Sequence, residues 1–497
     1  MTDLTKTSFV EGWRCPNRLW WYVHEPDAPE QTPSESDLLR MEQGQQVNER
    51  ARSYVPGGML IPRTPNLDER LERTRAAVAS GAPVLYSAAF RTDGVFVEVD
   101  ILARDDAGYR LIEVKSSNSV KQEHIPDIAI QMHVARGVGI PVTTAELMHL
   151  NGRCRFPDLT DLFVREDVTA EVEEILPAIP EQLAEQQRIL TGPNPGLTFG
   201  PQCFSARHCP FTDRCWPEVT RDHVLSLARV RLSKAYEWMQ QGVHAIQDLP
   251  ADARLPLVAQ RQVRSIKQGA MIIGPGLADA LAAFEAPMAF LDFETVQPAI
   301  PVWDGCWPWQ QVPVQFSCHV LDGDGALQHH EWLAEGSGDP REPLARAMIA
   351  ACAGACTVVS YWATFEKTRI TELAEALPEL ASDLLDINAR MVDLYPVVQN
   401  HLYHPDFLGS FSLKAVVRAL IPELAHDDLE VSEGGTASAL LMRYLLEPGR
   451  FTEDERAVLR RDLLAYCGRD TLVMVALLAK LTQLAALSGE REPGSMT

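Results

Sequence analysis

Residues 109–122 read YRLIEVKSSNSVKQ, and apolar and polar side chains alternate through Tyr109–Val114. Such alternation predicts a strand with one buried face. Glu113 and Lys115 lie two residues apart on this strand, so their side chains project from the same face. An acid and a base at the end of a mostly apolar strand indicate a site that uses both charges.

Segments around this strand predict one α/β domain with the order α-β-β-β-α-β. The serines within residues 25–37 can cap the first helix, and RDDAG is the turn that leads into Tyr109. Helices are expected at Leu38–Tyr54, 67–79 and 123–136, and strands at 83–90, 94–103, 109–115 and 140–149.

Composition places the chain among soluble globular proteins. Its 497 residues are 46% hydrophobic and 23% charged, which suffices for two or three domains. A net charge of −23 argues against a protein that coats nucleic acid, but it permits an enzyme with a local basic groove. No apolar run of membrane-span length and no leader-like start is apparent. We expect a cytoplasmic protein whose ten cysteines are free, catalytic or metal-bound.

An acid on the preceding strand can join Glu113 and Lys115. Asp100 lies among the apolar residues of VFVEVDIL, and the two strands are predicted to form a hairpin. Two carboxylates bind a hard divalent cation such as Mg²⁺, while the lysine orients or deprotonates an attacking water. The pattern predicts phosphodiester hydrolysis, with Glu98 as an accessory ligand. Charges on an edge strand are the simpler alternative.

With Gln131 on the following helix, this pattern resembles the PD-(D/E)XK nucleases of the RecB type. The resemblance implies a restriction-endonuclease-like fold in which Asp100 and Glu113 hold the metal. An earlier family motif is a glycine-led helix with a histidine four residues on. Here Asn48 stands at that position after Gly44, and Asn48 or the neighbouring Glu49 would take its place.

Three cysteines, Cys203, Cys209 and Cys215, have five residues between successive members, and Cys15 lies far upstream. RecB-like nucleases of the iron–sulfur type resemble this arrangement, with one cysteine before the nuclease core and three after it. The resemblance implies a [4Fe–4S] cluster that staples the ends of the domain together. Zn²⁺ also suits four sulfurs, and three unrelated thiols are the remaining alternative.

A second apolar strand, MAFLDFETV at 288–296, is interrupted by Asp292 and Glu294. Far downstream, Tyr466 and Asp470 are i and i+4 on one face of a helix. The combination resembles the DEDDy exonucleases, of RNase H-like fold. The resemblance implies that Asp292, Glu294 and Asp470 hold two Mg²⁺ or Mn²⁺ ions and that Tyr466 orients the attacking water.

The middle motif of that family is an asparagine followed shortly by an aspartate. Here VVSYWATFEKTRI offers Glu366 without an asparagine, and Asp393 is the alternative fourth acid. GSFSLKAVVRAL at 409–420 resembles the segment that approaches the substrate strand, which implies that Lys414 meets a phosphate. The tryptophans at 303, 307 and 309 are either a base-stacking surface or, as is more common, core.

We therefore predict three parts: residues 1–217 as the nuclease domain with its cysteines, 218–285 as a helical linker, and 286–497 as the exonuclease-like domain. Between 216 and 275, eight Lys/Arg face five Asp/Glu. EWMQQGVHAIQDLP in this linker resembles a helix-hairpin-helix. Its implied role is binding of the nucleic-acid backbone, for which the candidates are Arg261, Arg264 and Lys267.

The chain from about residue 10 to 483 resembles bacterial proteins that join a RecB-like nuclease to a DEDDy-like domain of the domain-of-unknown-function 2779 family. We expect a metal-dependent nuclease of single-stranded DNA or DNA ends, with a 3′–5′ exonuclease-like second centre and a role in repair, recombination or anti-phage defence by family analogy. Two alternatives stay open: a nucleic-acid-binding scaffold with decayed centres, and an exonuclease that trims RNA.

Overall fold

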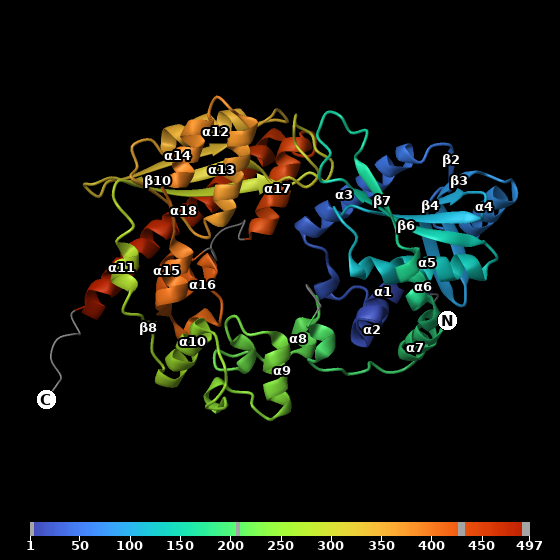
Figure 1. Cartoon of the computed structure of the whole chain (residues 1–497), viewed down its shortest axis with the longest axis horizontal. Helices are drawn as coiled ribbons and strands as arrows, with labels where there is room; N and C mark the ends of the chain where they lie inside the picture. Colours follow the sequence, from blue (N-terminus) through green and yellow to red (C-terminus); the bar gives the residue numbers. More distant parts are fainter. Residues whose placement is uncertain (1–3, 205–208, 426–432, 490–497) are drawn as a thin grey trace. The chain divides into compact units, whose positions relative to one another are not determined.

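The computed structural model describes residues 4–204, 209–425 and 433–489 (Figure 1). It divides into two units, residues 1–217 with 298–310, and residues 218–297 with 311–497. Both units are mixed α/β. The predicted linker at 218–285 groups with the second unit, and the short segment 298–310 groups with the first.

The first unit is built on a seven-stranded sheet of order β2-β3-β4-β5-β6-β7, with β1 paired to β4. The four predicted strands are confirmed to within two residues as β3 to β6. The strands are β1 (Leu4–Thr5), β2 (Gly58–Leu60), β3 (Val84–Thr92), β4 (Val95–Arg104), β5 (Tyr109–Lys115), β6 (Val142–Leu150) and β7 (Phe163–Asp167).

Helices cover both faces of this sheet. The three predicted helices are confirmed, and Ser34 caps the first of them by accepting the N–H of Asp37. Helix α5 packs against β3, β4 and β6 and is itself covered by α1, whereas α3 packs against β5. The helices are α1 (Lys6–Arg14), α2 (Pro16–His24), α3 (Glu35–Ala51), α4 (Leu67–Ala79), α5 (Ile125–Gly137), α6 (Thr169–Ile175), α7 (Ile179–Thr191) and α8 (Thr212–Cys215).

The hairpin of β4 and β5 opens at the predicted acids. Its ladder ends at the pair Ile101–Ile112, and beyond it the Asp100 carboxylate accepts the Val114 N–H at 2.9 Å. On the other side of β4, Ser87 lies opposite Asp100 with φ +57°. At its other end, β4 pairs with β1 instead of β5. Beyond the ladder, β4 and β5 therefore separate and leave room for side chains between them.

Residues 298–310 pack within the first unit although they follow a strand of the second. The buried N–H of Ala299 donates to Gln43 Oε1 of α3 at 2.5 Å. Trp303 is buried, and the indole N–H of Trp309 donates to the Ser116 carbonyl just after β5. Trp303 and Trp309 therefore serve packing. Trp307 is partly buried and has the Arg155 guanidinium 4.5 Å from its ring centroid, so base stacking stays a prediction for Trp307.

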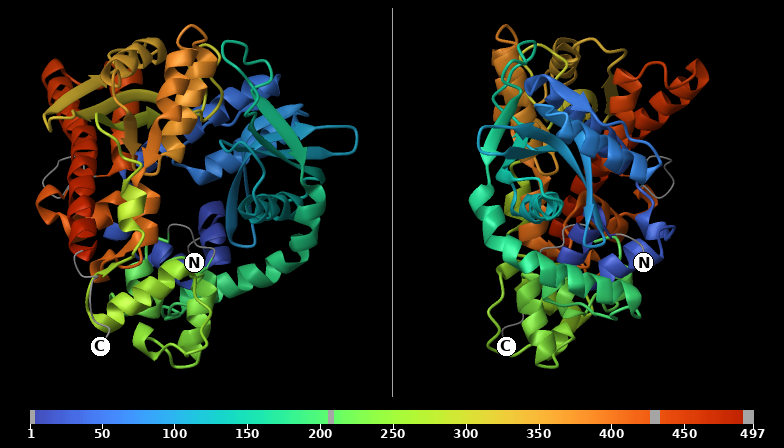
Figure 2. Two further views of the ribbon diagram at one scale, coloured as in Figure 1. Left: turned by 60° about the vertical axis from the view of Figure 1, so that its left-hand side comes forward. Right: turned by 90° about the vertical axis from the view of Figure 1, so that its right-hand side faces the viewer.

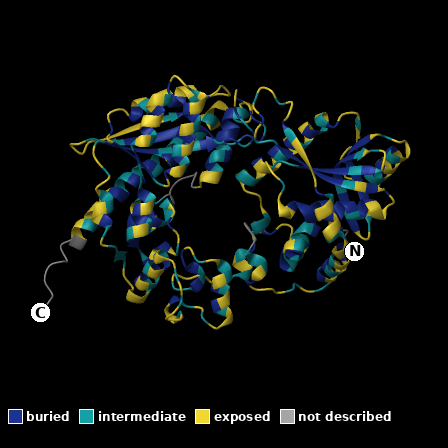
Figure 3. Cartoon of the chain, viewed as in Figure 1, coloured by how far each residue is buried: buried dark blue, intermediate teal, exposed yellow. Residues whose placement is uncertain are grey.

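The second unit is built on a five-stranded sheet of order β11-β10-β9-β12-β13, in which β9, β12 and β13 are parallel. The central strands of both sheets are mostly buried, whereas the edge strands β2, β7 and β11 are mostly exposed (Figure 3). The strands are β9 (Met288–Val296), β10 (Val312–Leu321), β11 (Leu327–Leu333), β12 (Thr357–Ser360) and β13 (Met391–Asp393), and a separate pair is formed by β8 (Ile272–Ile273) and β14 (Leu402–Tyr403).

Alternate residues of β9 enter two different cores. Ala289, Leu291 and Phe293 join the core with α12 (Arg341–Ala351), α13 (Thr364–Ala376) and α14 (Ala381–Ala389) (Figure 1). Met288 and Phe290 join the core on the other face with α15 (Leu394–His401), α16 (Leu413–Leu420) and α18 (Glu453–Gly489). A side-chain period of two therefore puts Asp292 and Glu294 on the face of α18.

The long helix α18 packs on β9 and β10 beside α17 (Gly434–Leu446), and it is the red helix of Figure 2. By length and composition, it is the one helix in the described parts of the chain that could cross a membrane. Half of its apolar window is buried inside the protein. Its contacts identify it as a core helix of the second unit.

The predicted helix-hairpin-helix is only half present. Helix α9 (Leu232–Gln240) is followed by a turn at Gly242, but the next element is a single 3₁₀ turn, Ile246–Asp248. Helix α10 (Leu257–Gln268) begins nine residues later and is followed by α11 (Leu277–Leu281). The prediction of a second helix directly after the glycine turn is therefore wrong.

The bond from Ala299 to Gln43 predicts a measurable stability loss. Gln43→Ala should lower the free energy of unfolding of the first unit by about 1–3 kcal/mol, because a buried N–H loses its acceptor. Urea unfolding of the full chain measures this. Gln46→Ala, at an exposed position of the same helix, is the matched control. Equal stability of the two variants would contradict the role given to segment 298–310.

Candidate metal centres and the cysteine pocket

Three acids meet in the second unit. Asp292 and Glu294 of β9 and Asp470 of α18 each place a carboxylate oxygen within 4.8 Å of the others. Among the described residues, no other group of three acidic, histidine or cysteine side chains comes this close. The predicted acids of strand and helix are therefore brought together, and Tyr466, one turn before Asp470, lines the same cavity.

The fourth acid beside them is Glu366 of α13. It is only 3% exposed, lines the same cavity, and its buried Oε2 has no hydrogen-bond partner. Asp393, the alternative, is used otherwise, because its Oδ1 accepts the backbone N–H of Trp362 and of Tyr395, both at 2.9 Å. Of the two candidates, the structure therefore brings Glu366 to the centre.

The carboxylates of this centre disfavour each other's charge. Burial raises the pKa of Asp292 well above its ordinary value, and the charges of Asp470, Glu366 and Glu294 raise it further. Burial and Asp470 raise the pKa of Glu294 in the same way. Burial also raises the pKa of Glu366 to about 7. Buried carboxyls whose pKa is raised by neighbouring acids in a cavity are typical of a functional site, and cations would relieve this repulsion.

A lysine and a tyrosine border the acids. Lys414, in the first turn of α16, donates from Nζ to the Tyr466 oxygen at 3.2 Å. Burial raises the pKa of Tyr466, and the charges of Asp470 and Glu294 add to the effect. The phenol therefore stays protonated. The cavity, of about 540 Å³, is also lined by aromatic side chains that the sequence motifs did not mark: Tyr361, Trp362, Phe365, Tyr395 and Phe411.

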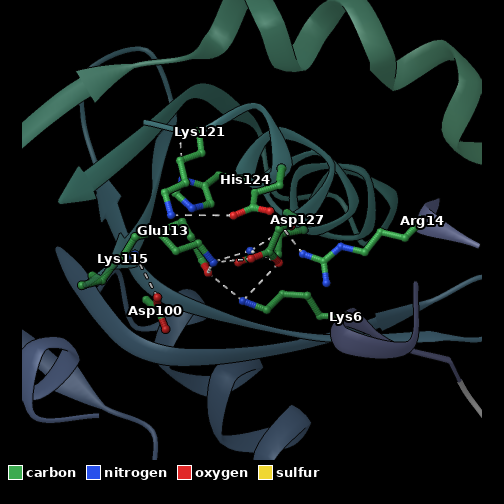
Figure 4. Close-up of polar contacts among 11 residues, drawn as sticks. Lys6, Arg14, Asp100, Glu113, Lys115, Lys121, His124 and Asp127 are labelled. Carbon is green, nitrogen blue, oxygen red and sulfur yellow. Dashed lines mark hydrogen bonds and ion pairs between the residues drawn. The ribbon is translucent and has the colours of Figure 1, made fainter. Parts of the chain in front are cut away.

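In the first unit, Glu113 accepts hydrogen bonds from three side chains, of which Lys6 and Lys115 are labelled in Figure 4. Its Oε1 accepts from Lys6 at 2.8 Å and from Lys115 at 2.7 Å. Its Oε2 accepts from Gln131 Nε2 at 2.9 Å. Asp127 pairs with both lysines, and its distance to Lys6 Nζ is 3.3 Å. The predicted Glu113, Lys115 and Gln131 are thus brought together, and Lys6 and Asp127 join them.

Both lysines of this cluster are cations. Burial lowers the pKa of Lys115, but Glu113 and Asp127 outweigh it and raise the pKa above its ordinary value. The same balance raises the pKa of Lys6. Of the two roles expected for Lys115, orienting a water fits this charge, whereas deprotonating it does not.

Asp100 and Glu113 line a cavity of about 680 Å³ together with Gly44, Asn48 and Glu49 of α3. The predicted replacement for the family's histidine is therefore near the acids. Glu98, expected as an accessory ligand, is instead paired with Arg63 and Arg70 and is not among the residues that line this cavity. The Glu98 carboxylate that would have to bind the metal ion is therefore engaged by two arginines.

The four predicted cysteines, Cys15, Cys203, Cys209 and Cys215, line one small pocket. Burial raises the pKa of Cys215, and the other three thiols are near enough to affect it, while a hydrogen bond from Asn17 at 3.4 Å acts in the opposite direction. The sulfurs do not form a group of three within 4.8 Å. Residues 205–208 of the predicted cysteine-rich stretch lie outside the described residues.

The basic candidates of the linker differ in exposure. Arg261 is partly buried and donates to the Gln399 carbonyl at 2.5 Å, and burial lowers its pKa. Arg264 and Lys267 are exposed one turn apart on α10. Arg261 is therefore partly engaged within its own unit, while the other two face solvent, and phosphate binding stays a prediction for all three.

Residues 289–412 match the family model of a domain of unknown function, DUF2779. The match begins in β9 and includes Asp292, Glu294 and Glu366, but it ends before Tyr466 and Asp470. A search of curated proteins gave no match to the chain.

The raised pKa of Glu366 predicts how stability depends on pH. Its folded value of about 7 exceeds the ordinary 4.5, so the folded protein holds this proton more tightly than the unfolded chain. Without metal, the stability that this group contributes is therefore lost as pH rises from about 4.5 to about 7. In EDTA at pH 8, Glu366→Gln should unfold at a higher temperature than the wild type, by about 1–3 kcal/mol in free energy.

The gain should shrink at pH 5, where the wild-type carboxyl is protonated, and at pH 8 when Mg²⁺ is added. Glu375→Gln, at an exposed position of the same helix, is the matched control and should show no gain. Calorimetry at both pH values measures the effect. A lower melting temperature for Glu366→Gln in EDTA at pH 8 would show that the ionised Glu366 carboxylate does not destabilise the folded protein.

Proposed function

We propose that this protein is a metal-dependent nuclease that hydrolyses phosphodiester bonds in DNA, with a 3′–5′ exonuclease centre in the second unit. One observation carries the proposal: Asp292, Glu294 and Asp470 converge within 4.8 Å in a cavity that Tyr466 also lines. The motifs on β9 and α18 resemble those of the DEDDy exonucleases, and the match to DUF2779 covers the strand with the first two acids.

The residues of this centre fit Mg²⁺ or Mn²⁺. Asp470, Glu366 and Glu294 raise the pKa of Asp292, and Glu366 Oε2 is buried without a hydrogen-bond partner. Cations would relieve the repulsion at Asp292 and could bind this carboxylate oxygen as a ligand. Asp292, Glu294 and Asp470 would hold two ions, with Glu366 beside them. When bound, two ions supply positive charge to the attacking and leaving oxygens.

The protein's own groups then position the reactants. A water oxygen bonds to the terminal phosphorus, and the bond from phosphorus to the 3′-oxygen of the penultimate nucleotide breaks. A proton of the water ends on that 3′-oxygen as a hydroxyl, and a nucleoside 5′-monophosphate leaves. Tyr466 stays protonated, so its O–H can donate to the attacking water and leave a lone pair directed at phosphorus. Lys414 supplies a cation beside it for a phosphate oxygen of the strand.

The first unit supports a second hydrolytic centre of the RecB-like PD-(D/E)XK type. Asp100 and Glu113 would hold one Mg²⁺ ion, and Gln131 fixes the orientation of Glu113. Lys115, as a cation, would orient the water and offset charge on the phosphate. One observation favours the alternative of a decayed centre that only grips the strand: Glu113 is already paired with Lys6 and Lys115.

The cysteine pocket fits an iron–sulfur cluster. The four thiols line one pocket, and four thiolates suit a [4Fe–4S] cluster. Zn²⁺, which four sulfurs also suit, is the alternative. Bound there, the cluster would join Cys15 to the segment that contains Cys203, Cys209 and Cys215.

Two substitutions separate the centres. Asp292→Asn should slow stepwise trimming of a 5′-labelled single strand by at least about 10²-fold, because a ligand of the two-ion centre is lost. Lys115→Ala should leave this ladder intact and abolish cleavage by the first centre. Asp383→Asn and Lys121→Ala, both exposed, are the matched controls.

The assay is run with Mg²⁺ or Mn²⁺ on DNA and RNA strands of one sequence, so faster trimming of RNA would reverse the substrate class. If Lys115→Ala removes the ladder while Asp292→Asn retains it, the second unit is not the exonuclease. Absence of cleavage by the wild type, with binding retained, would favour the scaffold.

The cluster has its own test. Protein purified without oxygen should be brown, contain iron, and absorb broadly near about 400 nm. Cys209→Ser should lose the colour and lower the melting temperature of the first unit, whereas Cys356→Ser, at an exposed cysteine, should do neither. Colourless protein with stoichiometric zinc would replace the iron–sulfur assignment by a four-thiolate zinc site.

A further inference from the structure

Trp362 occupies an unusual position beside the acidic centre of the second unit. It follows β12, is 52% exposed, and adopts φ +73°. A bulky side chain in the left-handed region costs of order 1–3 kcal/mol and persists only where neighbours enforce it. Here Asp393 enforces it by accepting the Trp362 N–H at 2.9 Å. A strained, half-exposed tryptophan at a cavity suggests a binding role.

The indole ring is supported from one side. It packs on the ring of Tyr395, with 4.5 Å between centroids. Tyr395 is itself fixed, because its backbone N–H donates to Asp393, which also anchors Trp362, and its hydroxyl accepts from Arg229 Nη2 at 2.6 Å. Tyr361 meets Tyr395 edge-on at 5.7 Å. The exposed part of the indole is therefore presented on a rigid base.

This aromatic surface and the three acids line the same cavity. Its volume of about 540 Å³ lies within the range of about 300–1,000 Å³ typical of small-ligand sites, and Trp362, Phe365 and Phe411 line it together with Asp292 and Asp470. Arg229 adds a positive charge at the same cavity. A flat apolar surface next to a cation-binding centre matches the two parts of a nucleotide, its base and its phosphate.

We infer that Trp362 stacks on the nucleobase at the 3′ end of the strand and so selects ends whose last base is unpaired. This inference rests on the proposed exonuclease function. Every base has a π face, so stacking favours single strands and frayed ends without reading sequence. A base paired in a duplex is not available to the indole.

The test varies both partners of the contact. A strand that ends in an abasic nucleotide keeps the sugar and phosphate but offers nothing to stack on. Loss of one stacked base costs about 1–3 kcal/mol, or about 5- to 150-fold. Trp362→Ala should therefore raise KM for the ordinary strand by a factor in that range, with kcat little changed, and Trp362→Phe should restore most of the loss.

On the abasic strand, the wild type should already show the higher KM, and Trp362→Ala should add nothing. Equal loss by Trp362→Ala on both strands, or no loss on either, would overturn the inference. The comparison of the two strands with the wild type needs no variant, so equal KM values on both strands would overturn the inference even if Trp362→Ala folds poorly.

The inference and the proposed function fail in different ways. Fluorescence anisotropy in EDTA measures affinity for the two labelled strands without cleavage. If the wild type trims nothing yet binds the ordinary strand more tightly, and Trp362→Ala removes that preference, the stacking site is supported and the exonuclease function is contradicted. If Asp292→Asn removes trimming while wild type and Trp362→Ala bind both strands equally, the exonuclease stands and the stacking site falls.

Discussion

Electrostatic repulsion among carboxylates that cannot move apart governs the second unit. Asp292 and Glu294 belong to β9, which is paired on both edges, with β10 and β12. The preceding residue on the same face, Phe290, is fully buried and fixes the strand in the core. Asp470 belongs to α18, whose packing on β9 and β10 holds it opposite. Since neither backbone can yield, protons or cations must relieve the repulsion.

The first unit solves the same problem differently. Glu113 and Asp127 are neutralised by Lys6 and Lys115 from the protein itself. A metal ion that binds Glu113 must therefore compete with two ammonium groups, and removing one partner of a buried pair leaves an uncompensated charge. The two centres are thus expected to differ in metal affinity, with the second needing cations more than the first.

Local patterns predicted much of this architecture. The period of two in β5 and β9 placed Glu113 with Lys115 and Asp292 with Glu294, and helical spacing placed Tyr466 with Asp470, because each rule acts within one element. Sequence alone left the choice between Glu366 and Asp393 open, since it depends on how α13 and β13 pack. Lys6 gave no signal, because it begins α1, 107 residues before Glu113 in the sequence, and only the tertiary packing brings the two together.

Trp362 was missed for a related reason. Its backbone conformation is imposed by Asp393, 31 residues away, so the neighbouring sequence does not indicate a left-handed backbone conformation at Trp362. Asp127, by contrast, lies four residues before Gln131 on one helix, and that spacing was a usable signal. Glu98 shows the opposite error, because a charged residue in a suggestive pattern was already engaged by Arg63 and Arg70.

The packing of residues 298–310 within the first unit affects the order in which the chain can fold during synthesis. Domains usually fold as units while the ribosome is still working, the N-terminal one first. Here Gln43 Oε1 and the Ser116 carbonyl after β5 accept hydrogen bonds from Ala299 and Trp309, which are translated only after β9. The nascent first unit therefore completes its packing only after β9 of the second unit has also emerged, so the folding of the two units is coupled during synthesis.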